Sequence, residues 1–319
     1  MRAFPLQKEA RMLYFIVNPA SGGEKGFERW RQAERKLEKL GIKYDVRITD
    51  KAGSATCIAR DICANTDIPA TIVAVGGDGT FNEVINGLDL SDDITVGYIP
   101  TGSGNDLARE LGLSKNPTTA LDTVLECRNI RRIDYGVMTY GAPDVVNRRF
   151  AVSCGIGYDA AVCEVLQKSS LTRVLSPVGM QKVAYTGLGA MQMLKSKPSR
   201  GYILLDGTRK IEFKDILFVA VHNGKTEGGG YRFAPQASAD DGFLSIGLVH
   251  TNNIMQFVKI LAHAKSGNHI KYSGVRTFDC KNVKIHVDDP MYTHTDGEII
   301  GLQNDIEVHC VESKLKIIV

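Results

Sequence analysis

The sequence of 319 residues lacks any apolar run of the roughly 18 residues that a membrane-spanning helix requires; the nearest is "ILFVAV" at 216–221. We therefore expect a soluble or peripheral protein. The sequence also lacks an excess of charge of one sign, because 39 basic and 36 acidic residues leave a net charge of only +3. This balance excludes a nucleic-acid-binding protein that works by bulk electrostatics, so any attraction to an anionic surface must be local.

A CxxC pair is also missing among the seven cysteines, and their odd number argues against a disulfide framework. We interpret them as buried thiols in a reducing compartment. The first residues are basic and then apolar, but the apolar run is too short for a signal peptide and ends at Asn18-Pro19. We expect residues 1–11 to be an extension before the first strand.

The first part of the chain alternates strand-like and helical patterns. Strand-like runs at 13–17, 44–48, 71–75 and 95–99 are separated by helical ones. This order predicts a mainly parallel sheet that is covered by helices. The run at 44–48 alternates polar and apolar residues, so we expect it nearer an edge of the sheet.

After about residue 133 the pattern changes to many short alternating runs separated by Gly, Asp and Asn. Strands at this spacing predict an antiparallel, sandwich-like or barrel-like second domain. Helical patterns interrupt it at roughly 179–195 and 254–265. We expect strands at the runs "IDYGV", "RFAVS", "YILLD", "KIEFK", "ILFVAV", "FLSIGLV", "VKIHV", "MYTHT" and "IEVHC".

Glycine-bearing turns follow three of the first four strands: "NPASGGEKG", "GGDGTFNE" and "PTGSGNDLARELG". In an open parallel sheet such turns share the carboxyl edge, where helix N-termini attract anions. One turn is weak evidence, but three together predict a polyphosphate site. Each turn also has the Ser/Thr-to-acid spacing of a capping box: Ser21 with Glu24, Thr80 with Glu83, and Ser103 with Asp106.

The middle turn is the most informative of the three. Phe81, Val84, Ile85 and Leu88 follow it at the spacing of one helix face. The sequence contains neither the GxxxxGK[ST] of a P-loop nor a GxGxxG at the first helix. Asp78 alone would repel phosphate, so either Mg²⁺ binds with the phosphate or Asp78 caps its own turn.

Together these turns resemble the diacylglycerol-kinase catalytic family, especially its soluble bacterial lipid kinases (DgkB/YegS-like). The stretches that carry the resemblance are "NPASGG" at 18–23, "GGDGTFNEV" at 76–84, "PTGSGNDLAR" at 100–109, "NGKTEGGGYRFAPQASADDGFLSI" at 223–246 and "TDGE" at 295–298. A GGDG turn alone is not specific, since phosphofructokinases and NAD kinases share it. The resemblance covers nearly the whole chain.

This resemblance implies an α/β fold with two domains. Residues 1–133, completed by 312–319, would form a Rossmann-like, doubly wound parallel-sheet domain that binds the nucleotide. Residues 134–311 would form an antiparallel β-sandwich domain for the lipid substrate, with the active site in the cleft between the domains.

The implied function is an ATP- and Mg²⁺-dependent lipid kinase that transfers the γ-phosphate to a hydroxyl of diacylglycerol or a related lipid. Such an enzyme would be cytoplasmic, peripheral to the inner face of an anionic membrane and independent of nucleic acid, with a homodimer left open. Two alternatives remain: an NAD kinase-like phosphotransferase, which shares the GGDG turn, and a catalytically silent nucleotide-binding regulator.

The resemblance also implies site residues. Glu298 would be the general base, in one turn with Asp296, and Asp78 would organise the catalytic Mg²⁺. Without the family, "TDGE" would be an ordinary hairpin tip. The ATP site would comprise Asn18, Pro19, Ala20, Ser21, Gly22, Thr49, Gly77, Asp78, Gly79, Thr80, Phe81, Asn82, Glu83 and Ser103. A structural Mg²⁺ would bind Asp241 and the backbone carbonyls of Ser238 and Phe243, although Asp241 alone reads as a loop aspartate.

Three further features have two interpretations each. Arg109 could reach phosphate or membrane, or be a solvated helix residue. The segment 179–200 could touch an anionic membrane through an apolar stripe flanked by basic residues, or pack in the core. His222 and His294 lie beside strand-like runs without metal-ligand spacing, so we interpret both as structural or supporting residues.

Overall fold

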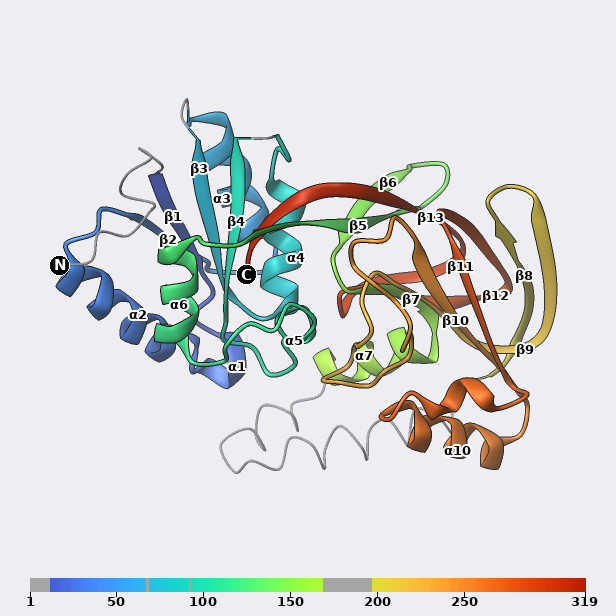
Figure 1. The fold of residues 1–319 in the computed structure, drawn as a ribbon. Coiled ribbons are helices and arrows are strands. Elements are labelled where there is room, and N and C mark those ends of the chain that lie inside the picture. The colour runs from blue at the N-terminus through green and yellow to red at the C-terminus, as the bar shows by residue number, and fades with distance from the viewer. Residues whose placement is uncertain (1–11, 67–68, 92, 169–196) are drawn as a thin grey trace. The chain divides into compact units, whose positions relative to one another are not determined.

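The computed structural model describes residues 12–66, 69–91, 93–168 and 197–319 (Figure 1). These residues form two compact units. The first contains the described chain up to Asp134 together with Ser313–Val319, and the second contains the described residues from Tyr135 to Glu312. Two strands, β5 (Ile130–Tyr140) and β13 (Glu298–Ile318), pass from one unit into the other.

The first unit is built on a parallel sheet with the strand order β13-β4-β3-β1-β2. At the β4 edge of this order, Ile317 of β13 pairs in parallel with Val96. The edge position of β2 confirms the prediction from its alternating pattern. The remaining strands of this sheet are β1 (Met12–Val17), β2 (Asp45–Ile48), β3 (Ala70–Gly76) and β4 (Ile94–Pro100).

Helices cover both faces of this sheet (Figure 1). Trp30 and Leu37 of α2 and Leu121 of α6 join Phe15 of β1 in one buried cluster. On the other face, Phe81 of α4 packs against Tyr98 with ring centroids 5.0 Å apart. The doubly wound α/β architecture is therefore confirmed. The helices are α1 (Ser21–Glu24), α2 (Gly26–Leu40), α3 (Ser54–Ala64), α4 (Asp78–Gly87), α5 (Asp106–Glu110) and α6 (Pro117–Glu126).

The second unit is built from antiparallel strand pairs, as predicted. β7 and β8 each pair with both β9 and β12, so these two short strands share one row between two long ones. The elements are β6 (Val146–Phe150), β7 (Ser153–Gly157), α7 (Tyr158–Lys168), β8 (Ser199–Leu205), β9 (Arg209–His222), β10 (Leu244–His250), α10 (Ile254–Ala264), η3 (Asn268–Lys271), β11 (Val275–Cys280) and β12 (Asn282–Thr295).

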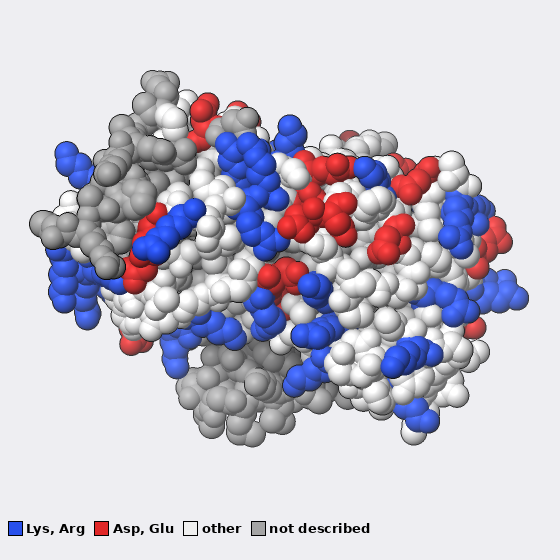
Figure 2. Space-filling view, viewed as in Figure 1, with Lys and Arg blue, Asp and Glu red and all other residues white. Residues whose placement is uncertain are grey.

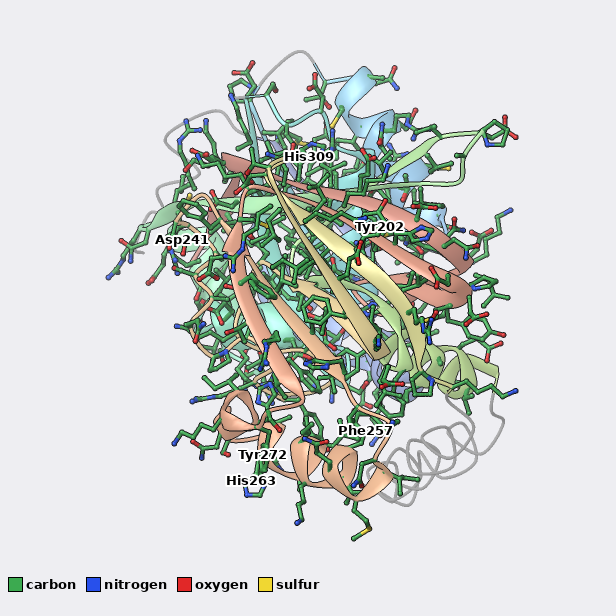
Figure 3. The ribbon with its side chains drawn as sticks, turned by 90° about the vertical axis from the view of Figure 1, so that its right-hand side faces the viewer. Tyr202, Asp241, Phe257, His263, Tyr272 and His309 are labelled. Atoms are coloured by element: carbon green, nitrogen blue, oxygen red, sulfur yellow. The ribbon has the colours of Figure 1, made fainter. Side chains whose placement is uncertain are left out.

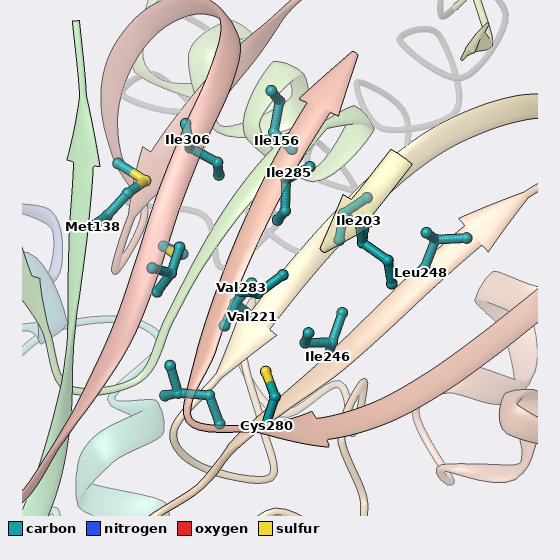
Figure 4. Close-up of a cluster of buried hydrophobic side chains, with 14 of the residues drawn as sticks. Met138, Ile156, Ile203, Val221, Ile246, Leu248, Cys280, Val283, Ile285 and Ile306 are labelled. Atoms are coloured by element: carbon teal, nitrogen blue, oxygen red, sulfur yellow. The ribbon is translucent and has the colours of Figure 1, made fainter. Parts of the chain in front are cut away.

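The core of the second unit is a cluster of inward-facing aliphatic side chains (Figure 4). Ile156, Ile203, Ile246 and Ile285 come from four different strands and are almost completely buried. Burial of this kind stabilises the fold by roughly 25 cal/mol per Å² of apolar surface removed from water.

Several local predictions need correction. "KIEFK" and "ILFVAV" form the single strand β9, and "VKIHV" and "MYTHT" form the single strand β12. The helix predicted at 254–265 is confirmed as α10, whereas the pattern at 179–195 and the extension at 1–11 lie outside the described residues. All seven cysteines are free, but only Cys154 and Cys280 are buried, so the interpretation of all seven as buried thiols is wrong. Within the described ranges no helix is long and apolar enough to cross a membrane.

Candidate functional site

Hydrogen bonds between side chains tie the three glycine-bearing turns of the first unit together. The amide of Asn18, just after β1, donates to Oγ1 of Thr80 in α4 at 2.9 Å. The hydroxyls of Ser21 and Thr101 lie 2.6 Å apart, which joins the turn after β1 to the turn after β4. The turns predicted to share the carboxyl edge of the sheet are therefore in direct contact.

Glycine is needed where these turns approach each other. A Cβ atom on Gly22, whose φ is +62°, would lie 2.2 Å from the carbonyl oxygen of Thr101. A Cβ on Gly102 would lie 2.4 Å from the Cα of Gly77. Since real Cβ atoms do not come this close to backbone, side chains at these positions would force the turns apart.

Asp78 binds the backbone of the neighbouring turn. Its two carboxylate oxygens accept the N–H groups of Asp106 at 2.9 Å and Leu107 at 3.2 Å, at the start of α5. This contact stabilises the α5 terminus, because a carboxylate satisfies N–H groups that have no partner inside the helix. The alternative in which Asp78 caps its own turn is thus replaced by a contact between turns.

The three capping boxes are wrong. α1, α4 and α5 have no side-chain cap, since Thr80 lies inside α4 and Ser21 binds Thr101. Glu83 instead accepts the N–H groups of Gly53 at 2.8 Å and Ala55 at 3.0 Å, around the start of α3. The spacing found acids at helix starts but gave them the wrong partners.

The other predicted nucleotide contacts fall into two groups. Ser103 is exposed between β4 and α5, and Asn18 is partly exposed at the end of β1. Thr49, Phe81 and Asn82 are buried, so contacts from these residues would have to come largely from the backbone. Pro19, Ala20, Gly77, Gly79 and Thr80 all belong to the two turns described above.

Arg109 is committed to its own turn. Its guanidinium forms an ion pair with Asp106 and donates to the carbonyl oxygen of Gly104 at 3.1 Å. These contacts favour a local role over the predicted contact with phosphate or membrane.

In the second unit, Asp296 and Gly297 form the two-residue turn between β12 and β13. Both have positive φ, 47° and 84°, as a type I′ hairpin turn requires. Asp296 is buried, and its carboxylate accepts the N–H groups of Ala151, Val152 and Ser153 at 2.9, 2.9 and 3.0 Å. These three contacts fix the turn to the bend between β6 and β7.

Glu298 is the first residue of β13 and pairs with Thr295 directly after this turn. Its side chain is partly exposed, unlike that of Asp296. Two acids that are two residues apart therefore differ in environment: Asp296 is held by backbone donors inside the unit, and Glu298 is open in part to solvent.

Asp159, Glu227 and His294 form a cluster that was not predicted. One possible ligand atom from each lies within 4.8 Å of the other two, so together they could hold a metal ion. Nε2 of His294 lies 3.2 Å from Asp159, and the N–H of Gly297 donates to its Nδ1 at 3.2 Å. A Cβ on Gly155 would lie 1.9 Å from the Asp159 carboxylate, so this cluster requires glycine there.

The charges of this cluster affect its neighbours. Burial would lower the pKa of His294, but Asp159, Glu227 and Asp296 outweigh it and raise the pKa. Burial raises the pKa of the Cys154 thiol well above its usual value, and Asp296, Asp159 and Glu227 act in the same direction. These thiols are kept protonated and unreactive.

His222 lies beside the cluster and is completely buried. Burial, together with His294 and His269, lowers its pKa to about 3. Its Nε2 lies 3.7 Å from the Glu227 carboxylate, and neither ring nitrogen makes a hydrogen bond with the described residues. The ring is therefore neutral at physiological pH. No spacing in the sequence indicated this cluster, since Asp159 and His294 are 135 residues apart.

The loop before β10 holds the three predicted ligands of a structural Mg²⁺. Asp241 is exposed there (Figure 3), and one carboxylate oxygen accepts the N–H of Phe243 at 3.0 Å. Ser238 donates to Asp240 at 2.7 Å. The metal site itself stays a prediction.

A depression of about 350 Å³ lies away from all these residues. It is lined at the C-terminal ends of α3 and α4 by Arg60, Cys63, Asn86 and Asp89, among others. It contains none of the predicted site residues.

Comparisons with known proteins cover both units. Residues 12–138 match the diacylglycerol kinase catalytic domain, and residues 152–319 match the YegS C-terminal NAD kinase beta sandwich-like domain. The chain is 31% identical over 299 residues to the diacylglycerol kinase of Bacillus subtilis, covering 92% of this chain and 91% of that protein. It is 27% identical over 298 residues to the diacylglycerol kinase of Staphylococcus saprophyticus, with coverages of 93% and 90%.

The fold also has solved counterparts. A crystal structure titled as a diacylglycerol kinase from Bacillus anthracis superposes with a TM-score of 0.68 at 20% identity, covering 97% of this chain and 96% of that one.

Proposed function

The chain belongs to the diacylglycerol kinase and YegS-like family of bacterial lipid kinases, and from this premise we propose that it transfers the γ-phosphate of ATP to a hydroxyl group of diacylglycerol or a closely related lipid. Relatives at 27% and 31% identity are named diacylglycerol kinases, which supports this acceptor. The family itself is one of lipid kinases.

The observation that carries the proposal is the direct contact between the three turns of the first unit. Glycines at positions 22, 77 and 102 let the backbones approach, and hydrogen bonds between Asn18 and Thr80 and between Ser21 and Thr101 hold them. A phosphate chain bound at this edge would meet a fixed polar surface rather than three independent loops. Such preorganisation is what phosphoryl transfer chiefly requires.

Asp78 has two tasks in this proposal. Its oxygens accept N–H groups from α5, yet each carboxylate oxygen has two lone pairs, so water-mediated contact with Mg²⁺ remains open to it. When bound with ATP, Mg²⁺ would neutralise charge on the phosphate oxygens. Asp78 would thus fix α5 and orient the metal's water ligands at the same time.

Glu298 is the proposed general base. A lipid hydroxyl must lose its proton as its oxygen bonds to the γ-phosphorus and the bond to ADP breaks. The Glu298 carboxylate would accept that proton, and its partly exposed position after a fixed turn supports this role. Asp296, whose carboxylate already accepts three backbone N–H groups, would position the turn rather than react.

Metal binding in the second unit is a separate proposal. Asp241 would bind a structural Mg²⁺ with the carbonyl oxygens of Ser238 and Phe243, since hard oxygen ligands suit that ion. Its exposed carboxylate keeps one oxygen that does not accept the Phe243 N–H. Equilibrium dialysis with Mg²⁺ should lose one site in Asp241→Asn; unchanged stoichiometry would remove this site from the proposal.

We propose cytoplasmic action at the surface of an anionic membrane, because the substrate is a lipid and the described residues contain no membrane-spanning helix. The segment 179–200 that was predicted to touch the membrane lies outside the described residues up to 196. The contact must therefore be argued from other parts of the chain.

A labelling assay tests the proposed function. Purified protein with Mg²⁺ and γ-labelled ATP should label diacylglycerol in mixed micelles. Labelling of NAD alone would support the NAD kinase-like alternative, which the description of the matched C-terminal domain also suggests. Absence of turnover with every lipid and with NAD, while ATP still binds, would support the silent regulator.

A further inference from the structure

Helix α10 has a second apolar face that nothing in the described structure covers. Phe257, Ile260 and Ala264 are buried and pack the helix onto the second unit. Ile254, Met255 and Val258 are 43%, 64% and 41% exposed. At 100° per residue, these three side chains and the exposed Ala262 lie within one arc of about 100° on the outer side of the helix.

The charge around this face is of one sign. From Thr251 to Phe278 the chain contains Lys259, Lys265, Lys271 and Arg276 but neither Asp nor Glu. This is unusual for a chain in which basic and acidic residues nearly balance, 39 against 36. Over the part of Figure 2 where α10 lies, basic side chains stand in an otherwise uncharged surface.

The helix is held rigidly enough to present this face. Asn253 caps its N-terminus by accepting the N–H groups of Met255 at 2.9 Å and Gln256 at 3.2 Å. At the other end, the hydroxyl of Tyr272 lies 3.2 Å from Nδ1 of His263 (Figure 3). Phe257 packs in a buried cluster with Phe218, so the inner face anchors what the outer face exposes.

We propose that the outer face of α10 docks onto an anionic lipid bilayer, with Ile254, Met255 and Val258 entering the acyl boundary and Lys259 and Lys265 contacting phosphate headgroups. The exposed apolar arc matches the hydrocarbon, and the absence of acids next to it matches the negative surface. This combination favours a bilayer over a protein partner, for which apolar contact alone would suffice. The inference rests on the proposed function only for the identity of the membrane-borne substrate.

Vesicle co-sedimentation tests the docking surface. The full chain should bind vesicles of phosphatidylcholine with about 30% phosphatidylglycerol, bind phosphatidylcholine alone far more weakly, and dissociate as salt is raised. Met255→Ser with Val258→Ser should weaken binding on the order of tenfold. Lys259→Gln and Lys265→Gln should each weaken it about fivefold.

Matched controls come from exposed residues elsewhere. Val145→Ser with Leu302→Ser removes apolar side chains that are 61% and 54% exposed, and Lys214→Gln removes a lysine on β9. These controls should bind vesicles as the unaltered chain does. Equal losses in the controls, or unaltered binding by the α10 variants with native circular dichroism, would overturn the proposal.

A kinase assay separates this inference from the proposed function. The α10 variants should lose activity on diacylglycerol in vesicles but keep the kcat of the unaltered chain on a short-chain acceptor dissolved in water. If the unaltered chain phosphorylates no acceptor but binds vesicles through α10, the proposed function fails and the docking surface stands. If it is active and the α10 variants are fully active on vesicles, only the docking surface fails.

Discussion

The turns of the first unit and the Asp296–Gly297 turn of the second unit are fixed in different ways. In the first unit, neutral pairs such as Ser21 with Thr101 and close glycine contacts spread the task over three loops. In the second, one buried carboxylate accepts three backbone N–H groups. Many weak contacts tolerate single changes, whereas one charged contact concentrates the risk, because an unsatisfied buried group costs more than a lost neutral hydrogen bond.

The largest expected effect separates chemistry from support at the second turn. Glu298→Gln should lower kcat by 10²- to 10⁴-fold, about the contribution of a general base, with ATP affinity and the melting temperature unchanged. Steady-state kinetics and calorimetry check this. Glu307→Gln, farther along β13, is the control and should be fully active. A Glu298→Gln enzyme with substantial activity would remove Glu298 from the base role.

Asp296→Asn should destabilise the protein by about 3 kcal/mol, because an amide group would face backbone N–H donors that now meet a carboxylate. Urea unfolding measures the change, with the exposed Asp305→Asn as control. The kcat should also fall while KM for ATP stays the same. A loss below about 1 kcal/mol would contradict the contrast between the two turns.

His222→Phe tests the buried charge next to the second turn. The pKa of His222 is about 3 in the folded chain and about 6.5 when unfolded, so protons bind the unfolded state first. Its contribution to stability is present above pH 6.5 and lost as pH falls toward 3, by about 1.4 kcal/mol per unit.

At pH 5 the His222→Phe variant should therefore be about 2 kcal/mol less sensitive to acid than the unaltered chain. Urea unfolding at pH 7 and pH 5 gives the difference. Phe also leaves no unpaired ring nitrogen. The exposed His309→Phe is the control (Figure 3). Identical pH slopes for both variants would contradict the assignment.

The smallest effect belongs to the first unit. Ser21→Ala should cost about 1 kcal/mol, since it removes one neutral hydrogen bond to Thr101 while the glycine contacts remain. Ser103→Ala, which is exposed, should cost almost nothing. Equilibrium unfolding and the double variant with Thr101→Val measure the coupling. A cost equal to that of Asp296→Asn would mean that both turns depend on single contacts.

The sequence predicted those parts of the fold that local periodicity controls. Phe81, Val84, Ile85 and Leu88 have the spacing of one helix face, and all four are buried in the first unit. Strand ends were predicted less well, because turn signals can occur inside strands. Asp215 has a positive φ of 58°, as a turn residue would, yet β9 continues through it.

The candidate site was predictable as motifs but not as contacts. The GGDG turn indicated Asp78, but its partners lie 28 and 29 residues away in another turn. Likewise, no pattern connects Asp159 with Glu227 and His294, since tertiary packing alone brings them together. Spacing reports what one element presents, and side-chain partners across elements depend on topology.

The parallel pairing of Ile317 with Val96 affects the order in which the chain can fold. β4 gains this neighbour only from Ser313–Val319, more than 200 residues later in the chain. During synthesis, the second unit is therefore complete before the first. Until then β4 is an open sheet edge that other chains could pair with. We expect the first unit to need protection from aggregation for almost the whole time of translation.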